Sequence, residues 1–130
     1  REEGIQSDLT MRSLSEGDLR TLFIVATALD LPNNSTFIIE EIENGLHPNR
    51  IMKVIEHLDT FSKVKNIQII FSTHNPTVIN YLKPQNVLFV GKNEHGTHFE
   101  LLDTSEDISK IKELLNTGGR MSDYIATRLH

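Results

Sequence analysis

Hydrophobic residues in the first half of the chain alternate between helical and strand patterns. A long apolar segment predicts a helix that Ser15 caps and Pro32 ends. Because this segment is apolar around most of its circumference, we expect the helix to be buried on more than one side. Residues 36–39 form a short continuous apolar run, typical of a central parallel strand covered on both faces, and residues 67–71 form a second apolar run. Between them, apolar residues at helical spacing after Pro48 predict a second helix (Ile51, Val54, Ile55, Leu58 and Phe61).

The second half of the chain predicts shorter elements. A helix is expected over residues 76–82, followed by strands at 87–90 and 97–102 whose short connection indicates a hairpin. Residues 107–115 predict another helix, and a final amphipathic segment follows it. This alternation predicts an α/β fold with flanking helices, a mostly parallel central sheet and the hairpin at the edge of that sheet.

Composition narrows the class of protein. The chain has 130 residues, and its net charge of −5 argues against a broadly basic nucleic-acid surface. The absence of Cys excludes disulfides and Cys-ligated zinc. The longest apolar run, residues 22–26, is too short to span a bilayer, so a cytoplasmic protein without a membrane segment is expected. We interpret residues 1–130 as one domain, with a motif region at 14–76 and accessory strands and helices at 86–130.

Two acidic residues follow the first predicted strand. Glu40 and Glu41 come directly after residues 36–39, where like charges repel and desolvation is costly. A hard cation such as Mg²⁺ with an attached phosphate would relieve that repulsion. The alternative is that both side chains simply reach solvent.

Polar residues also follow the second strand and open the first helix. His74 ends a Ser-Thr-His segment that follows the second strand, where it could contact a terminal phosphate. Ser15 and Gly17 offer a hydroxyl and a close backbone approach at a helix N-terminus, which suits an anion. Each motif alone has an ordinary structural explanation, as a cap or a core residue. Arg20 is interpreted as a helix-surface ion pair, with phosphate neutralisation as the alternative.

In combination these motifs are more specific. Leu-Ser-Glu-Gly at 14–17, Phe-Ile-Ile-Glu-Glu at 37–41, Asn-Gly-Leu-His-Pro at 44–48 and Phe-Ser-Thr-His at 71–74 occur in this order. The sequence resembles the carboxyl-terminal half of an ABC-type ATPase head of the SMC-like and OLD-like branch of AAA-family predicted ATPases, over about residues 9–90. The segments match, in turn, the signature loop, the Walker B strand, the D-loop and the switch histidine.

The resemblance implies a P-loop NTPase lobe, with ATP and Mg²⁺ as cofactors. It assigns Glu41 as the general base, Glu40 as the Mg²⁺-linked acid and His74 as the γ-phosphate contact. It further implies that Ser15 and Gly17 touch a nucleotide held by the opposite head of a homodimer. Asn44, Gly45 and His47 would then communicate across that dimer.

Two features depart from the family pattern. The metal-linked acid is usually Asp, whereas Glu40 is one methylene longer, and Glu16 stands where the signature often has Gly. The 130 residues also hold no Gly-x-x-x-x-Gly-Lys-Ser/Thr phosphate cradle. We therefore expect the Walker A half to lie upstream in the same protein, and this chain alone to be inactive.

The intact head is expected to power DNA repair, chromosome maintenance or phage defence, with DNA or a nuclease as a possible partner. Two alternatives come from other classes. One is a non-catalytic dimerisation or interaction module, in effect a degenerate head. The other is a metal-dependent nuclease that uses Glu40, Glu41, Glu43 and His74, although it lacks the Asp-x-Asp pair of topoisomerase-primase nucleases.

Overall fold

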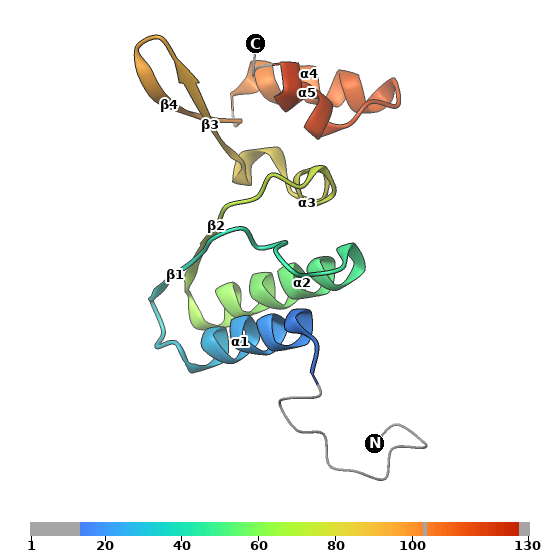
Figure 1. Cartoon of the computed structure of the whole chain (residues 1–130). Helices are drawn as coiled ribbons and strands as arrows, with labels where there is room; N and C mark the ends of the chain where they lie inside the picture. Colours follow the sequence, from blue (N-terminus) through green and yellow to red (C-terminus); the bar gives the residue numbers. More distant parts are fainter. Residues whose placement is uncertain (1–13, 103, 128–130) are drawn as a thin grey trace. The chain divides into compact units, whose positions relative to one another are not determined.

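A computed structural model describes residues 14–102 and 104–127. The chain divides into two compact units, Arg1–Thr73 and His74–His130, and each is described by itself. The first unit contains α1 (Glu16–Asp30), β1 (Thr36–Ile39), α2 (Pro48–Lys65) and β2 (Gln68–Phe71). The second contains α3 (Pro76–Tyr81), the 3-10 helix η2 (Pro84–Asn86), β3 (Leu88–Asn93), β4 (Gly96–Leu101), α4 (Ser105–Asn116) and α5 (Met121–Thr127) (Figure 1).

Both helices of the first unit begin as the sequence predicts. Ser15 is the N-cap of α1, where its hydroxyl accepts from the backbone N–H of Asp18 and the Asp18 carboxylate accepts from the backbone N–H of Ser15. This reciprocal capping box satisfies two backbone donors that the helix itself cannot pair. Pro48 occupies the first turn of α2, where its missing N–H costs nothing. Asn66 ends α2 in a left-handed conformation, with φ of 52°.

The strands β1 and β2 pair in parallel, which confirms the predicted parallel pairing. Thr36 lies opposite Gln68, and Ile38 lies opposite Ile70. Parallel neighbours need a crossover, and α2 supplies it. The sheet of the first unit has two strands, so it is smaller than the central sheet that the sequence predicts.

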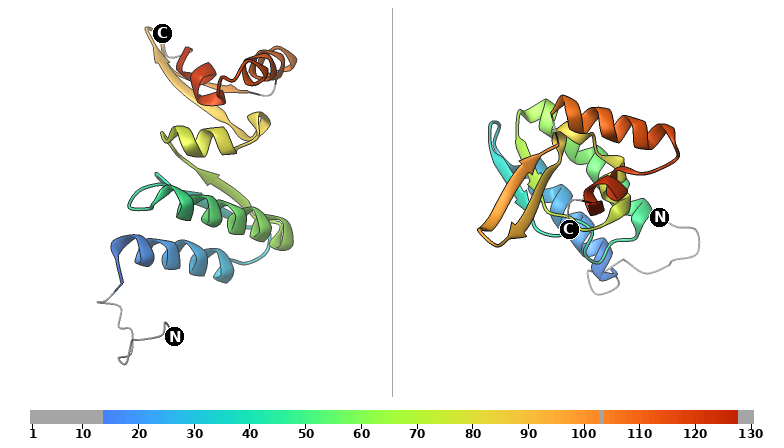
Figure 2. Two further views of the ribbon diagram at one scale, coloured as in Figure 1. Left: turned by 90° about the vertical axis from the view of Figure 1, so that its right-hand side faces the viewer. Right: turned by 90° about the horizontal axis from the view of Figure 1, so that it is seen from above.

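The helices α1 and α2 lie side by side and run in the same direction (Figures 1 and 2). At their N-terminal ends Arg50 pairs with Asp18. At their C-terminal ends Lys65 Nζ donates to the carbonyl oxygen of Leu29 at 2.5 Å. Between these ends the two helices and the strands enclose a core that is almost entirely aliphatic (Ile24, Ala28, Ile39, Ile42, Ile51, Val54, Ile55, Leu58 and Ile67).

The prediction that α1 and β1 are covered on more than one side is wrong for the described residues. On α1, Phe23 is 69% exposed, and on β1, Ile38 is 72% exposed. Thr36, Ile38, Gln68 and Ile70 are all exposed, so one face of the strand pair is open. The physical reason is that α1 and α2 cover only one face of a sheet of this size.

The second unit confirms the predicted short helix, hairpin and C-terminal helices. Strands β3 and β4 are antiparallel, with Leu88 opposite Leu101 and Asn93 opposite Gly96. A separate core forms where Leu102, Ile111 and Met121 meet. Partly buried residues from α3, from α5 and from the positions directly after α3 and η2 pack around it (Ile79, Leu82, Val87, Tyr124 and Ile125). Asp107 is a buried acidic residue of this unit, and the Tyr124 hydroxyl donates to it at 2.6 Å.

The sequence predicts the hairpin at the edge of the parallel sheet, whereas β3 and β4 form a two-stranded sheet of their own in the described residues. Along the chain, α3 and η2 lie between β2 and β3. The alternating exposure along β4 leaves Phe99 and Leu101 on an open face. None of the helices in the described ranges has the length and apolar character needed to cross a bilayer.

Candidate functional site

The segment after β1 leaves the sheet abruptly and exposes two carboxylates. Glu40 and Glu41 are both exposed, while the next residue, Ile42, is completely buried. Glu41 has φ of 45°, in the left-handed region that residues with a β-carbon rarely adopt. The change of direction at Glu41 allows Ile42 to enter the core while the two acidic side chains remain at the surface.

Hydrogen bonds from Ser72, directly after β2, and from the loop that follows Glu41 hold Glu41 in this conformation. Its backbone N–H donates to Ser72 Oγ at 2.8 Å. The backbone N–H of Asn44 donates to its carbonyl oxygen at 2.9 Å, which closes a turn. On either side, Ser72 N–H donates to Ile39 O at 3.0 Å and Ile42 N–H donates to Ser72 O at 3.1 Å. The serine of the predicted switch segment therefore positions the backbone of the predicted base.

Arg20 contacts the same segment from α1. One guanidinium nitrogen, Nη2, donates to the carbonyl oxygen of Glu40 at 2.8 Å and to that of Glu41 at 2.9 Å. The interpretation of Arg20 as a helix-surface ion pair is therefore corrected, because its guanidinium donates to main-chain carbonyls. No local sequence pattern predicts these bonds, because their partners lie 20 and 21 residues away along the chain.

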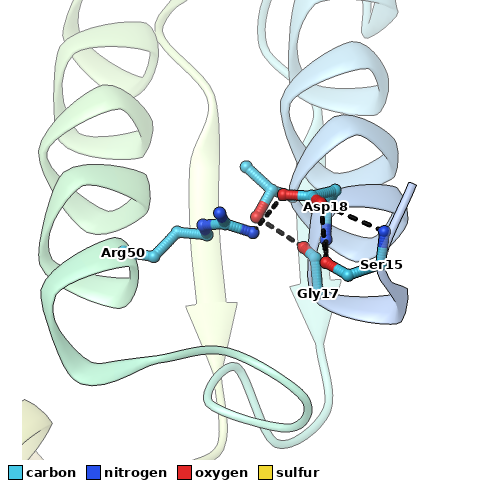
Figure 3. Close-up of polar contacts among 5 residues, drawn as sticks. Ser15, Gly17, Asp18 and Arg50 are labelled. Atoms are coloured by element: carbon cyan, nitrogen blue, oxygen red, sulfur yellow. Dashed lines mark hydrogen bonds and ion pairs between the residues drawn. The ribbon is translucent and has the colours of Figure 1, made fainter. Parts of the chain in front are cut away.

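The start of α1 is held by a second arginine. Figure 3 shows Arg50 reaching from the first turn of α2 towards Asp18, with Ser15 on the other side of the same carboxylate. The hydrogen bond from the Ser15 hydroxyl, at 2.6 Å, lowers the pKa of Asp18 below its ordinary 3.8, and the Ser15 backbone and Arg50 act in the same direction. Arg50 thus links the N-terminal turns of α1 and α2.

Gly17 and Gly45 meet at this position. Gly17 is buried, and a β-carbon built on it would lie 2.5 Å from the carbonyl oxygen of Gly45. Real β-carbons essentially never approach a backbone oxygen so closely, so only glycine fits at position 17 without a shift. Gly45 itself has φ of 71°, which also favours glycine. The segments 14–17 and 44–48 are therefore packed together through two glycines.

The rest of the segment 44–48 leads into α2. His47 is the N-cap of this helix, and its Nδ1 accepts from the backbone N–H of Asn49 at 3.4 Å. Asn44 is exposed and its backbone closes the turn with Glu41. The geometry gives His47 a structural task as a cap, and the predicted communication role of Asn44, Gly45 and His47 stays a prediction.

His74 belongs to the second unit, of which it is the first residue. It lies between β2, which ends at Phe71, and α3, which Asn75 caps through its side chain. The first unit thus brings together seven of the eight predicted site residues at one end of its strands and helices (Ser15, Gly17, Glu40, Glu41, Asn44, Gly45 and His47). The role of His74 at a phosphate stays a prediction.

The donor groups fit a magnesium ion that is bound largely through a nucleotide. Among the described residues there is no group of three or more His, Asp or Glu side chains that could hold a metal ion by themselves. Mg²⁺ in phosphoryl-transfer sites is typically held by one or two carboxylates together with substrate phosphates and water. An exposed Glu40 at the end of β1 suits that arrangement.

Comparison with known proteins gives the chain a family. Residues 1–80 match the family model described as "AAA domain, putative AbiEii toxin, Type IV TA system". The chain is also 29% identical over 104 residues to the "Retron Vc95 probable ATPase" of Vibrio cholerae serotype O1 biovar El Tor. That match covers 78% of this chain and 20% of the relative, so the chain corresponds to about a fifth of that protein's length.

The family match spans α1, β1, α2 and β2, with the exposed acidic pair after β1 and the paired glycines beside it. These elements form an α/β unit with a parallel strand pair, as a P-loop NTPase requires. The chain therefore belongs to this AAA family of P-loop ATPase domains.

Proposed function

We propose that this chain forms the catalytic, carboxyl-terminal part of a dimeric ABC-type ATPase head that hydrolyses ATP. The observation that carries the proposal is the meeting of three sequence motifs at one end of the first unit. Gly17 of the signature-like loop packs on the Gly45 carbonyl of the D-loop-like segment. Arg20, from the same helix as Gly17, holds the carbonyls of Glu40 and Glu41.

Glu41 is the residue that we assign to water activation. Its carboxylate is exposed, while its backbone is fixed by Ser72 and Arg20, so the side chain projects from a rigid anchor. Phosphoryl transfer depends mainly on positioning and charge stabilisation, and a carboxylate that orients the attacking water suits that chemistry. Glu40 would hold Mg²⁺, which supplies positive charge against the phosphate oxygens when bound.

The remaining predicted residues act on phosphate or across the dimer in this proposal. Ser15 and Gly17 contact the nucleotide of the opposite head, and His74 contacts the γ-phosphate. Asn44, Gly45 and His47 transmit the state of one site to the other. The phosphate cradle comes from a segment outside these 130 residues, since the sequence contains no Gly-x-x-x-x-Gly-Lys-Ser/Thr loop.

The work that hydrolysis powers is DNA repair, chromosome maintenance or phage defence in this proposal, with DNA or a nuclease as partner. This assignment is supported by a relative whose name associates a probable ATPase with a retron. A metal-dependent nuclease is less well supported, because the family model that matches residues 1–80 is that of an AAA domain.

Glu41→Gln in the full-length protein tests the proposal. The amide keeps the size of the side chain but cannot accept the proton of the attacking water, so ATP turnover should fall on the order of 100-fold or more. ATP binding should persist, and the variant should accumulate as an ATP-bound dimer. Turnover is measured as phosphate release, and the dimer by light scattering after gel filtration.

Glu113→Gln is the matched control, because Glu113 is exposed on α4 and the same chemical change there should leave turnover intact. Unchanged turnover in Glu41→Gln would refute the catalytic assignment. A folded wild-type protein that binds no ATP and hydrolyses none would instead favour the interaction module. Mg²⁺-dependent DNA cleavage that Glu41→Gln abolishes would favour the nuclease.

A further inference from the structure

We propose that Arg20 is a positioning residue that sets the direction of the Glu41 carboxylate and makes it depend on α1. This inference rests on the proposed function, because it concerns the residue assigned there to water activation. It adds a residue that the family motifs in this sequence do not include.

The two bonds of Arg20 act on the two peptide groups that flank Glu41. The carbonyl of Glu40 belongs to the peptide group before the Glu41 α-carbon, and the carbonyl of Glu41 belongs to the one after it. A single nitrogen, Nη2, donates to both, at 2.8 and 2.9 Å. Since the orientation of these two groups defines φ and ψ of Glu41, Arg20 restrains both backbone angles and with them the direction in which the side chain leaves the backbone.

The conformation fixed in this way is one that Glu would not adopt without support. A left-handed residue with a β-carbon costs roughly 1–2 kcal/mol and persists only where the surroundings hold it. At Glu41, where φ is 45°, the support consists of Arg20 on both carbonyls, Ser72 Oγ on the N–H and the Asn44 N–H on one carbonyl. Ser72 contacts both peptide groups as well, because its carbonyl oxygen accepts from the Ile42 N–H at 3.1 Å, and Arg20 contacts both of them from α1.

Arg20 is also the contact that joins this segment to α1. It lies one turn after Gly17, and Thr21 beside it donates to the carbonyl of Gly17 at 2.8 Å. The Nε of Arg20 is buried and has no hydrogen-bond partner among the described residues, so the guanidinium is enclosed there and not simply solvated. A shift of the start of α1 would therefore be transmitted to the backbone of Glu41.

Arg20→Ala and Arg20→Lys in the full-length protein test this inference, with Lys63→Ala as the control. Lys63 lies on α2 in an exposed pair with Asp59, so its removal deletes a positive charge away from Glu41. Two readouts are needed. Steady-state kinetics give kcat and KM for ATP, and amide hydrogen exchange reports the backbone at Glu41 and Asn44.

For Arg20→Ala we expect kcat to fall on the order of 10-fold, because misdirecting a catalytic group slows the chemical step. KM for ATP should stay within about twofold, since substrate contacts are unchanged. The amides of Glu41 and Asn44 should exchange faster, while those of Val54 and Ile55 in α2 keep their protection. Arg20→Lys should recover part of kcat, because its ammonium reaches a carbonyl but lacks the rigid planar fork. Lys63→Ala should match the wild type.

Unchanged exchange at Glu41 and Asn44 would overturn the inference whatever happens to turnover. Faster exchange with unchanged kcat would overturn it as well, because the backbone would then move without consequence. A loss of activity that only follows a lower melting temperature, with no recovery in Arg20→Lys, would indicate a purely structural role. If the wild type does not hydrolyse ATP, the proposed function fails, and exchange alone decides whether Arg20 holds this backbone.

Discussion

At the scale of single residues, Asp18 connects the stability of the first unit to pH. Its carboxylate accepts from Ser15 and pairs with Arg50, and these contacts lower its pKa in the folded state below the ordinary 3.8. A group with a lowered folded pKa stabilises the fold above its unfolded pKa, and this contribution disappears as the pH falls through the folded value. Below pH 4 the unfolded chain takes up the proton first.

We therefore expect Asp18→Asn to be less stable than the wild type at neutral pH. The difference should shrink as the pH falls from about 4 towards 2. Urea unfolding at a series of pH values measures it. A difference that stays constant down to pH 2 would show that the carboxylate has no lowered pKa. Other carboxylates titrate over the same pH range, so the stability of the wild type alone does not report on Asp18. The difference in free energy of unfolding between the wild type and Asp18→Asn isolates its contribution.

At the scale of elements, the contact between α1 and the loop before α2 depends on Gly17. An Ala in a helix normally stabilises it by up to about 1 kcal/mol relative to Gly. Here the added β-carbon would lie 2.5 Å from the Gly45 carbonyl oxygen. We expect Gly17→Ala to lower the free energy of unfolding by about 1–3 kcal/mol, as overpacking typically does.

Chemical denaturation measures this change, and Ala26→Gly on the exposed side of α1 calibrates the intrinsic effect. That control should cost about 1 kcal/mol, because glycine loses more backbone entropy than alanine. If Gly17→Ala were as stable as the wild type, the Gly45 loop would have to yield easily, and the close packing of the two segments would not matter.

The secondary-structure elements are the part of this structure that the sequence predicts well. The helices, the parallel strand pair and the hairpin follow from local signals such as the Ser15 cap, Pro48 and the apolar runs. Exposure of Phe23 and Ile38 could not be predicted, because it depends on how many layers cover a strand pair. The contacts of Arg20 could not be predicted either. Every residue has a main-chain carbonyl, so residue types do not indicate which carbonyls Arg20 contacts.

At the scale of the whole molecule, the two units have separate cores. Leu102, Ile111 and Met121 form the core of the second unit, whereas Ile51 is among the buried residues of the first. Both tyrosines, Tyr81 and Tyr124, lie in the second unit, and the chain has no Trp. Tyrosine fluorescence of this chain therefore reports on the second unit, while circular dichroism reports on the helices of both.

We expect the two signals to give different denaturation midpoints, since each unit unfolds with its own core. Ile111→Ala should shift the midpoint measured by tyrosine fluorescence. Ile51→Ala should shift the unfolding of the first unit, measured by circular dichroism. Each should cost about 2–5 kcal/mol, because each residue is at most 1% exposed. Coincident midpoints in the wild type and in both variants would mean that the chain unfolds as one cooperative body.

The left-handed backbone at Glu41 has a consequence for protein engineering. Glycine or asparagine would occupy this conformation at lower energy than a residue with a longer side chain. Automated redesign for thermal tolerance would thus rank Glu41 among the first positions to replace. If the carboxylate activates water, such a redesign would yield a more stable protein that has lost its catalytic activity. Stability and activity then place opposite demands on the residue at this one position.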